Sequence, residues 1–178
     1  NDVSDNRFIK LFFFGNYFYG LCAVALSIEA MLQQKYPLNG LLYFSLVFFS
    51  TVFYYSHAYV LTEVSEHSTN VRAAWYAQQA KLVFLSRLVF FTAIVGISLY
   101  FVFIFRINFL AISLYELLFI FIFPLVSLLY YGINHSFFKK LNLRNIGWLK
   151  PFIIGFIWAG LVPVYPVLFY NISKGTHD

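Results

Sequence analysis

The sequence predicts an all-α protein, a polytopic transmembrane helix bundle with about five spans. Of its 178 residues, 61% are hydrophobic and 11% are charged, with a mean hydropathy of +0.76. A soluble domain is about 45–50% apolar and about 25% charged. Five apolar runs are each long enough to cross about 30 Å of hydrocarbon as a helix, and none alternates as a barrel strand would. We therefore expect residues 1–178 to form a single transmembrane helical domain.

The five spans are expected, in order, at about 8–31, 41–61, 82–105, 109–131 and 152–170. Gly15 and Asn16 interrupt the first span, which is too long for the apolar core of a signal peptide and is expected to be retained. Because the chain begins with Asn rather than Met, we expect it to be trimmed or processed. A very short turn at 106–108 predicts that the third and fourth spans are antiparallel neighbours. No inverted repeat or pair of broken helices is expected, which disfavours a transporter or a channel.

The positive charge of the chain indicates orientation rather than nucleic-acid binding. The net charge is +5, and the bases lie mostly between apolar runs. Eight bases fall on the side of the N-terminus and three on the other side, so we expect a cytoplasmic N-terminus. The eight are Arg7, Lys10, Arg72, Lys81, Lys139, Lys140, Arg144 and Lys150, and the three are Lys35, Arg106 and Lys174.

A single cysteine, Cys22, excludes an intrachain disulfide and a cysteine-based zinc site within this sequence. Glycines at 15, 20, 96, 155 and 160 would suit close packing of helices.

Four polar residues are expected inside the membrane: Asn16, His57, Arg87 and Glu116. Their placement makes them functional candidates, because a polar group at this depth is costly unless it is paired or hydrated. The Cα atoms of Arg87 and Glu116 would differ in height by roughly 15 Å, too far for a simple ion pair. Arg87 is expected to reach toward the cytoplasmic side, and Glu116 to be protonated, bonded to a neighbouring helix or lining a wet cavity. His57 is either a hydrogen-bonded neutral side chain or a ligand of haem or a pigment.

The loop after the second span holds a candidate metal pair. Glu63 and Glu66 are three residues apart, so a continuing helix would place both on one face. Two carboxylates of this kind can hold Mg²⁺, and Arg72, Lys139, Lys140 and Arg144 on the same predicted side could neutralise a diphosphate. The alternative is a solvated loop with orienting bases.

At this loop the chain resembles the UbiA-type intramembrane prenyltransferases. The stretch RFIKLFFFGNYFYG, with Arg7 and Asn16, is similar to the start of their first span, and AYVLTEVSEHSTNVR stands where they carry a diphosphate-binding loop. LLYYGINHSFFKK and LKPFIIGFIWAGLVPVYP resemble their fourth span and the one after it. The resemblance implies a helix bundle that binds Mg²⁺ and an isoprenyl diphosphate.

The departures from that family concern its acids and its length. No Asp lies between Asp5 and Asp178, so the family's metal-binding aspartates are missing and only Glu63 and Glu66 stand nearby. The family has about nine spans, so this chain resembles the N-terminal half of such a protein.

Two functions follow from these observations. The first is a non-catalytic subunit of a membrane complex, or a protein that binds lipid or isoprenoid, with membrane lipids and other membrane-protein subunits as partners and no cofactor. The second is a Mg²⁺-dependent prenyltransferase acting on an isoprenyl diphosphate, with the catalytic residues left open. Either protein would reside in the bacterial inner (cytoplasmic) membrane.

Overall fold

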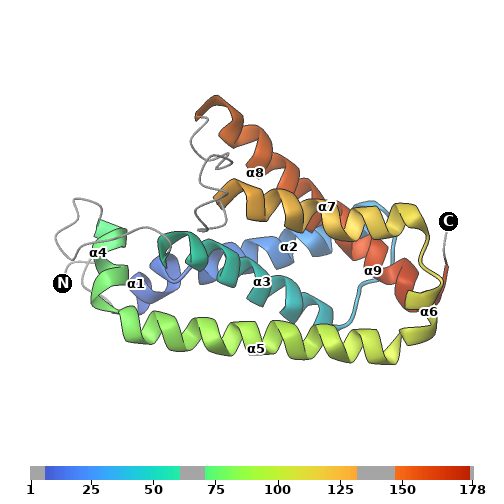
Figure 1. Cartoon of the computed structure of the whole chain (residues 1–178), viewed down its shortest axis with the longest axis horizontal. Coiled ribbons are helices and arrows are strands. Elements are labelled where there is room, and N and C mark those ends of the chain that lie inside the picture. Colours follow the sequence, from blue (N-terminus) through green and yellow to red (C-terminus); the bar gives the residue numbers. More distant parts are fainter. Residues whose placement is uncertain (1–6, 61–70, 132–146, 177–178) are drawn as a thin grey trace. The chain divides into compact units, whose positions relative to one another are not determined.

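Helices make up all the regular structure in residues 7–60, 71–131 and 147–176, the ranges that the computed structural model describes. The chain begins with α1 (Arg7–Phe14), α2 (Tyr17–Gln33), α3 (Leu41–Val60) and α4 (Val71–Gln78). It continues with α5 (Ala80–Ile104), α6 (Arg106–Leu110) and α7 (Leu114–Tyr131), and it ends with η4 (Gly147–Leu149), α8 (Lys150–Ala159), the π-helical η5 (Gly160–Val164) and α9 (Tyr165–Lys174) (Figure 1). The all-α prediction is confirmed for these residues.

Two described helices are long and apolar enough to cross a membrane. One is α5 and the other is the 25-residue helix formed by α8, η5 and α9. Their most apolar 18-residue windows have mean hydropathies of 2.2 and 2.1. A third span is reached if α1 and α2, which meet at a bend of 58°, are one broken span. The apolar parts of α3 and α7 are shorter. The described residues thus support a membrane-spanning protein with two to three spans of full length.

The chain divides into two compact units, which are described separately. Unit 1 comprises Asn1–Ala25 and Gly40–Tyr100, and unit 2 comprises Leu26–Asn39 and Phe101–Asp178. The expectation of one domain over 1–178 stays a prediction.

Small residues and rings hold the helices of unit 1 together. A Cβ at Gly20 of α2 would lie 2.7 Å from the ring of Phe48 and 2.8 Å from Val52, both on α3, so glycine allows these helices to approach closely. The rings of Phe49 on α3 and Phe90 on α5 stack with centroids 5.5 Å apart. The interior of unit 1 is therefore built by α2, α3 and one face of α5.

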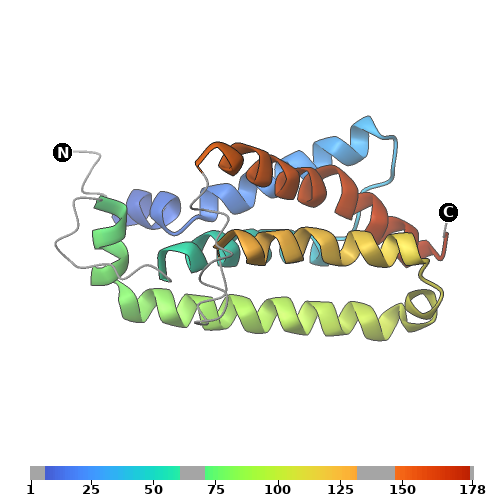
Figure 2. The ribbon, with the colours of Figure 1, turned by 45° about the horizontal axis from the view of Figure 1, so that its top comes forward.

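In unit 2, α7 packs antiparallel to the helix formed by α8, η5 and α9 (Figure 2). Pro124 lies inside α7 and has no N–H to donate to the carbonyl of Ile120 four residues earlier. The hydroxyl of Tyr165 donates to that carbonyl at 2.9 Å instead. A neighbouring helix thus supplies the hydrogen bond that the proline removes, which is how transmembrane helices tolerate proline.

Removing the Tyr165 hydroxyl tests this substitution of one donor for another. Tyr165→Phe is expected to lower the free energy of unfolding by about 1 kcal/mol, the usual net contribution of one hydrogen bond. In a Pro124→Ala background, the new backbone N–H of residue 124 can donate to the carbonyl of Ile120. Tyr165→Phe should then lower the free energy of unfolding by clearly less. A double-mutant cycle of unfolding in detergent micelles measures the difference, and equal costs in both backgrounds would show that Ile120 does not depend on Tyr165.

One expectation about the chain path is wrong. The residues 106–108 do not form a short turn: they begin the helix α6, and α7 starts at Leu114 rather than near 109. One broken span, formed by α1 and α2, is present in the described residues; the expectation that no pair of broken helices exists stays a prediction.

Candidate functional site

The break between α1 and α2 lies at Gly15 and Asn16. The N–H of Gly15 still donates to the carbonyl of Leu11 at 2.8 Å, whereas Asn16 has a φ of 67°. A left-handed residue just after a helix is a common way to end it, and Asn is among the few side chains that tolerate this conformation. The first span is therefore interrupted where its sequence predicted, and the polar side chain that ends α1 is fully buried, with 0% of its surface exposed.

Asn16 is the centre of a buried hydrogen-bond network, here called the Asn16 cluster, which comprises Asn16, Ser56, Arg72 and Tyr76. The amide Nδ2 of Asn16 donates to the hydroxyl of Tyr76 at 2.9 Å and to that of Ser56 at 3.2 Å. Its Oδ1 accepts from Nη2 of Arg72. Both N–H groups and the carbonyl of the side chain are thus engaged by residues 40 to 60 positions further along the chain.

Arg72 and Tyr76 also bind the exposed backbone end of α1. The last carbonyls of a helix have no partner within it and carry partial negative charge. Nη2 of Arg72 lies 3.2 Å from the carbonyl oxygens of both Phe13 and Phe14, and the Tyr76 hydroxyl donates to that of Phe14 at 2.9 Å. Arg72, expected as a diphosphate ligand, lies here at a helix C-terminus, where a cation stabilises the structure.

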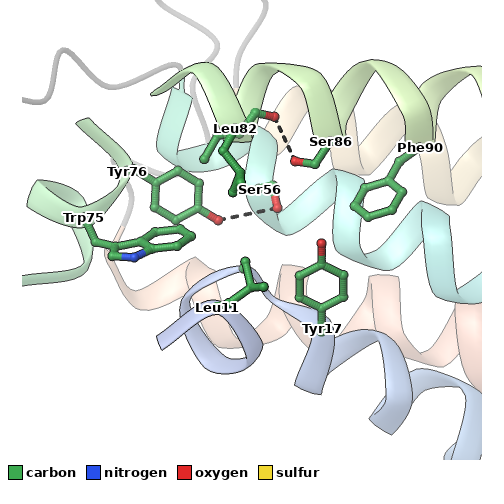
Figure 3. Close-up of a pocket in the computed structure, with 10 residues that line it drawn as sticks. Leu11, Tyr17, Ser56, Trp75, Tyr76, Leu82, Ser86 and Phe90 are labelled. Carbon is green, nitrogen blue, oxygen red and sulfur yellow. Dashed lines mark hydrogen bonds between the residues drawn. The ribbon is translucent and has the colours of Figure 1, made fainter. Parts of the chain in front are cut away.

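A small cavity adjoins the Asn16 cluster (Figure 3). The hydroxyls of Tyr17 and Ser56 face into it from opposite sides, and Ser86 lies on the wall formed by α5 (Figure 3). The centre of a water molecule can move over about 10 Å³ within it, roughly the room that one water needs. The cavity is lined by Leu11, Gly15, Tyr17, Ser56, Trp75, Tyr76, Leu82, Val83, Ser86 and Phe90. As it stands, it has no room for an isoprenoid chain.

Arg87 and His57 form a second polar site in unit 1. Nη2 of Arg87 on α5 lies 2.6 Å from Nδ1 of His57 on α3, and its guanidinium carbon lies 5.6 Å from the centroid of the Phe53 ring. We expected Arg87 to extend toward the cytoplasmic side with no named partner. In the structure, Nδ1 of His57 on α3 is a partner of Arg87, and the expected direction of Arg87 relative to a membrane stays a prediction.

Glu116 belongs to a helix start, not to the middle of a span. Its Oε2 accepts from the backbone N–H of Ser113 at 2.8 Å and from the Ser113 hydroxyl at 2.9 Å. The hydroxyl in turn lies 3.3 Å from the N–H of Glu116. This reciprocal arrangement is a capping box, which joins Glu116 to the start of its own helix. The three roles expected of Glu116 stay predictions.

Several predicted site residues lie outside the described ranges. They are the candidate metal ligands Glu63 and Glu66 and the candidate diphosphate ligands Lys139, Lys140 and Arg144. Among residues 7–60, 71–131 and 147–176, no group of three or more His, Cys, Asp or Glu side chains could hold a metal ion. The magnesium site therefore stays a prediction.

Sequence reasoning missed Ser56 and Tyr76 as partners of Asn16, and it missed the capping role of Arg72. No local pattern marks these contacts, because they join distant segments. The capping box did have a signal, Ser113 followed three residues later by Glu116 before an apolar run.

Comparison of the chain with protein-family models, with characterised proteins and with solved structures found no match.

Proposed function

We propose that the chain is an integral membrane protein that acts as a non-catalytic subunit of a membrane complex, built on a UbiA-like helix bundle. The observation that carries the proposal is the exposure of α5: only 6% of its most apolar 18-residue window is buried. Its large exposed side chains include Phe84, Leu88, Phe91, Leu99 and Phe103. Such a surface is unfavourable in water by roughly 25 cal/mol per Å², so lipid and partner helices cover it.

We propose further that α3 and α7 also cross the bilayer, giving five spans with a cytoplasmic N-terminus. Their apolar parts run from 41 to 57 and from 114 to 130, near the lower limit of about 17 residues for a spanning helix. Contacts within unit 2 support this alternation. Asn39 donates to the carbonyl of Pro166 at 2.8 Å, and Asn108 donates to that of Ile172 at 2.7 Å. The segments that hold Asn39, Asn108 and α9 are all assigned to the outer side by alternation. These two bonds join them within unit 2.

The non-catalytic assignment is supported by what the polar groups of unit 1 do. Asn16 and Arg72, which a prenyltransferase would direct at its substrate, are bonded to each other and to the end of α1. The adjoining cavity accommodates about one water, and the chain has no Asp between Asp5 and Asp178. These observations support a scaffolding role for the polar groups of unit 1.

The alternative, a Mg²⁺-dependent prenyltransferase, is tested by direct assay. Membranes containing the chain are supplied with labelled isoprenyl diphosphate, Mg²⁺ and candidate acceptors, and we expect no transfer above membranes without it. Transfer that disappears in Glu63→Gln would overturn the non-catalytic assignment. The subunit role is tested by purification in mild detergent from native membranes, where recovery of an isolated monomer alone would contradict it.

Cysteine labelling tests the proposed orientation. In a Cys22→Ala background, Gln79→Cys places an exposed thiol just before α5 and Ala111→Cys places one between α6 and α7. A membrane-impermeant maleimide applied to intact cells should label the thiol at 111 and leave that at 79 unlabelled until the cells are opened. The reverse pattern would contradict the orientation. Labelling of both thiols from outside would show that α5 does not cross the membrane.

A further inference from the structure

The guanidinium of Arg87 has no carboxylate partner among the described residues of unit 1. Those residues contain no Asp or Glu at all, since the acids of this unit's sequence lie at 2, 5, 63 and 66. Arg87 contacts His57 and the Phe53 ring, and its Nε is buried without a hydrogen-bond acceptor among the described residues. Nε is closed to solvent, so an outside anion or water can bind only the Nη N–H groups of this partly exposed side chain. A guanidinium at bilayer depth requires such a partner.

The contact between Arg87 and His57 determines how the imidazole is protonated. Arginine has only N–H donors and does not lose its proton in proteins. Nδ1 of His57, 2.6 Å from Nη2 of Arg87, must therefore be the acceptor. The imidazole is then neutral, with its proton on Nε2, and that N–H is a further donor on the side of the ring that faces away from the guanidinium. The ring of Phe53, stacked on His57 with centroids 6.0 Å apart, holds the imidazole in place.

The position of Arg87 along α5 places this pair of donors near one face of the bilayer. Arg87 is the eighth residue of a 25-residue helix, so its Cα lies about 10 Å along the helix from Ala80. The helix is longer than about 30 Å of hydrocarbon requires, which brings Arg87 within a side chain's length of the headgroups. Its neighbours Phe84, Leu88 and Phe91 are exposed, as acyl-chain contacts would be.

We propose that Arg87 and His57 bind the phosphate of an anionic phospholipid in the leaflet facing the N-terminus. The guanidinium supplies the positive charge and the N–H donors of Nη1 and Nη2 to the phosphate. The Nε2–H of His57, on the other side of the ring, can donate to a second oxygen of the same headgroup, so the site favours an anionic headgroup over a cation or a neutral headgroup. The proposal rests on the membrane placement of α5, which the labelling of residues 79 and 111 tests independently.

Lipid retention by the purified full chain tests the site. The protein in detergent micelles is supplied with equal amounts of phosphatidylglycerol and phosphatidylcholine, and bound lipid is counted by native mass spectrometry. The parent chain should retain phosphatidylglycerol preferentially. Arg87→Gln should lower that retention by about tenfold or more, the range for losing a hydrogen bond to a charged group. His57→Phe, which keeps a ring against Phe53, should lower it about fivefold.

Controls separate this site from bulk charge and from misfolding. Arg106→Gln removes an equal charge from an exposed residue beyond the far end of α5 and should change retention by less than about twofold. If Arg87→Gln does not fold, Arg87→Lys, which keeps the charge and loses the fork, should still reduce retention several-fold. Unchanged retention in the folded Arg87 variant overturns the proposal.

Two further outcomes would also overturn it. Inorganic pyrophosphate that displaces phosphatidylglycerol at equal concentration would make the ligand a free phosphate rather than a lipid. Retention that rises several-fold in a Glu63→Gln, Glu66→Gln double variant would show that loop carboxylates occupy Arg87. Phosphatidylglycerol retention that is unchanged by pyrophosphate and unchanged in the double variant supports a lipid site.

Discussion

Replacing Asn16 with alanine is expected to lower the free energy of unfolding by about 3 kcal/mol, the largest effect of a single polar substitution in unit 1. The change leaves buried groups of Ser56, Arg72 and Tyr76 without their shared partner, and each unsatisfied group costs about 1–3 kcal/mol before it finds another. It also forces a Cβ-bearing residue without a polar side chain into a φ of 67°, which adds about 1–2 kcal/mol.

Asn16→Gly is the matched control for that prediction. Glycine loses the same hydrogen bonds but adopts a positive φ without strain, so it should be about 1 kcal/mol more stable than the alanine variant. Equilibrium unfolding in mixed detergent micelles measures both. An alanine variant within about 0.5 kcal/mol of the parent, the range of ordinary surface changes, would show that the Asn16 cluster does not hold α1 and α2 together.

Gly160→Ala is expected to destabilise unit 2 by about 2 kcal/mol, within the usual cost of overpacking. A Cβ at position 160 would overlap ring atoms of Phe123 on α7. That ring cannot easily move, because it is buried and contacts Phe156 and Tyr165 with centroids 4.8 and 5.5 Å away. The added methyl must therefore separate α7 from the helix that carries residue 160.

Gly155→Ala provides the comparison on the same helix. A Cβ there meets no described atom within 4 Å, so the change should be neutral or stabilising by up to about 1 kcal/mol, the helix preference of alanine over glycine. Thermal unfolding of both variants, followed by circular dichroism, gives the ranking. The expectation fails if the two variants melt together, and Phe123→Leu should restore much of the loss in Gly160→Ala if the ring is the obstacle.

The helices themselves could be predicted because their cause is local. Long apolar runs form helices in lipid, and Gly15 and Asn16 marked the break in the first one. The start of α7 was predicted too early because the run from 109 was treated as continuous, while Ser113 and Glu116 form a capping box that begins the helix at Leu114. A helix end depends on a few hydrogen bonds, which mean hydropathy does not register.

The contacts of the polar residues could not be predicted, because they depend on which segments meet. Of the glycines expected at helix contacts, Gly20 and Gly160 do pack against other helices, whereas a Cβ at 96 or 155 would meet no described atom within 4 Å. The sequence identified Asn16, His57 and Arg87 as unusual. Their partners became visible only when residues 30 to 60 positions apart were brought together.

The binding of Arg72 and Tyr76 to the end of α1 has a consequence for biosynthesis. These bonds join residues 58 to 62 positions apart, so they cannot form while the ribosome has delivered only the first two helices to the membrane. Until α4 has been translated, the carbonyls at the end of α1 and the amide of Asn16 depend on water or lipid headgroups. The bonds that hold the end of α1 therefore form only after α4 has been translated, and a chain truncated before position 72 would lack both Arg72 and Tyr76.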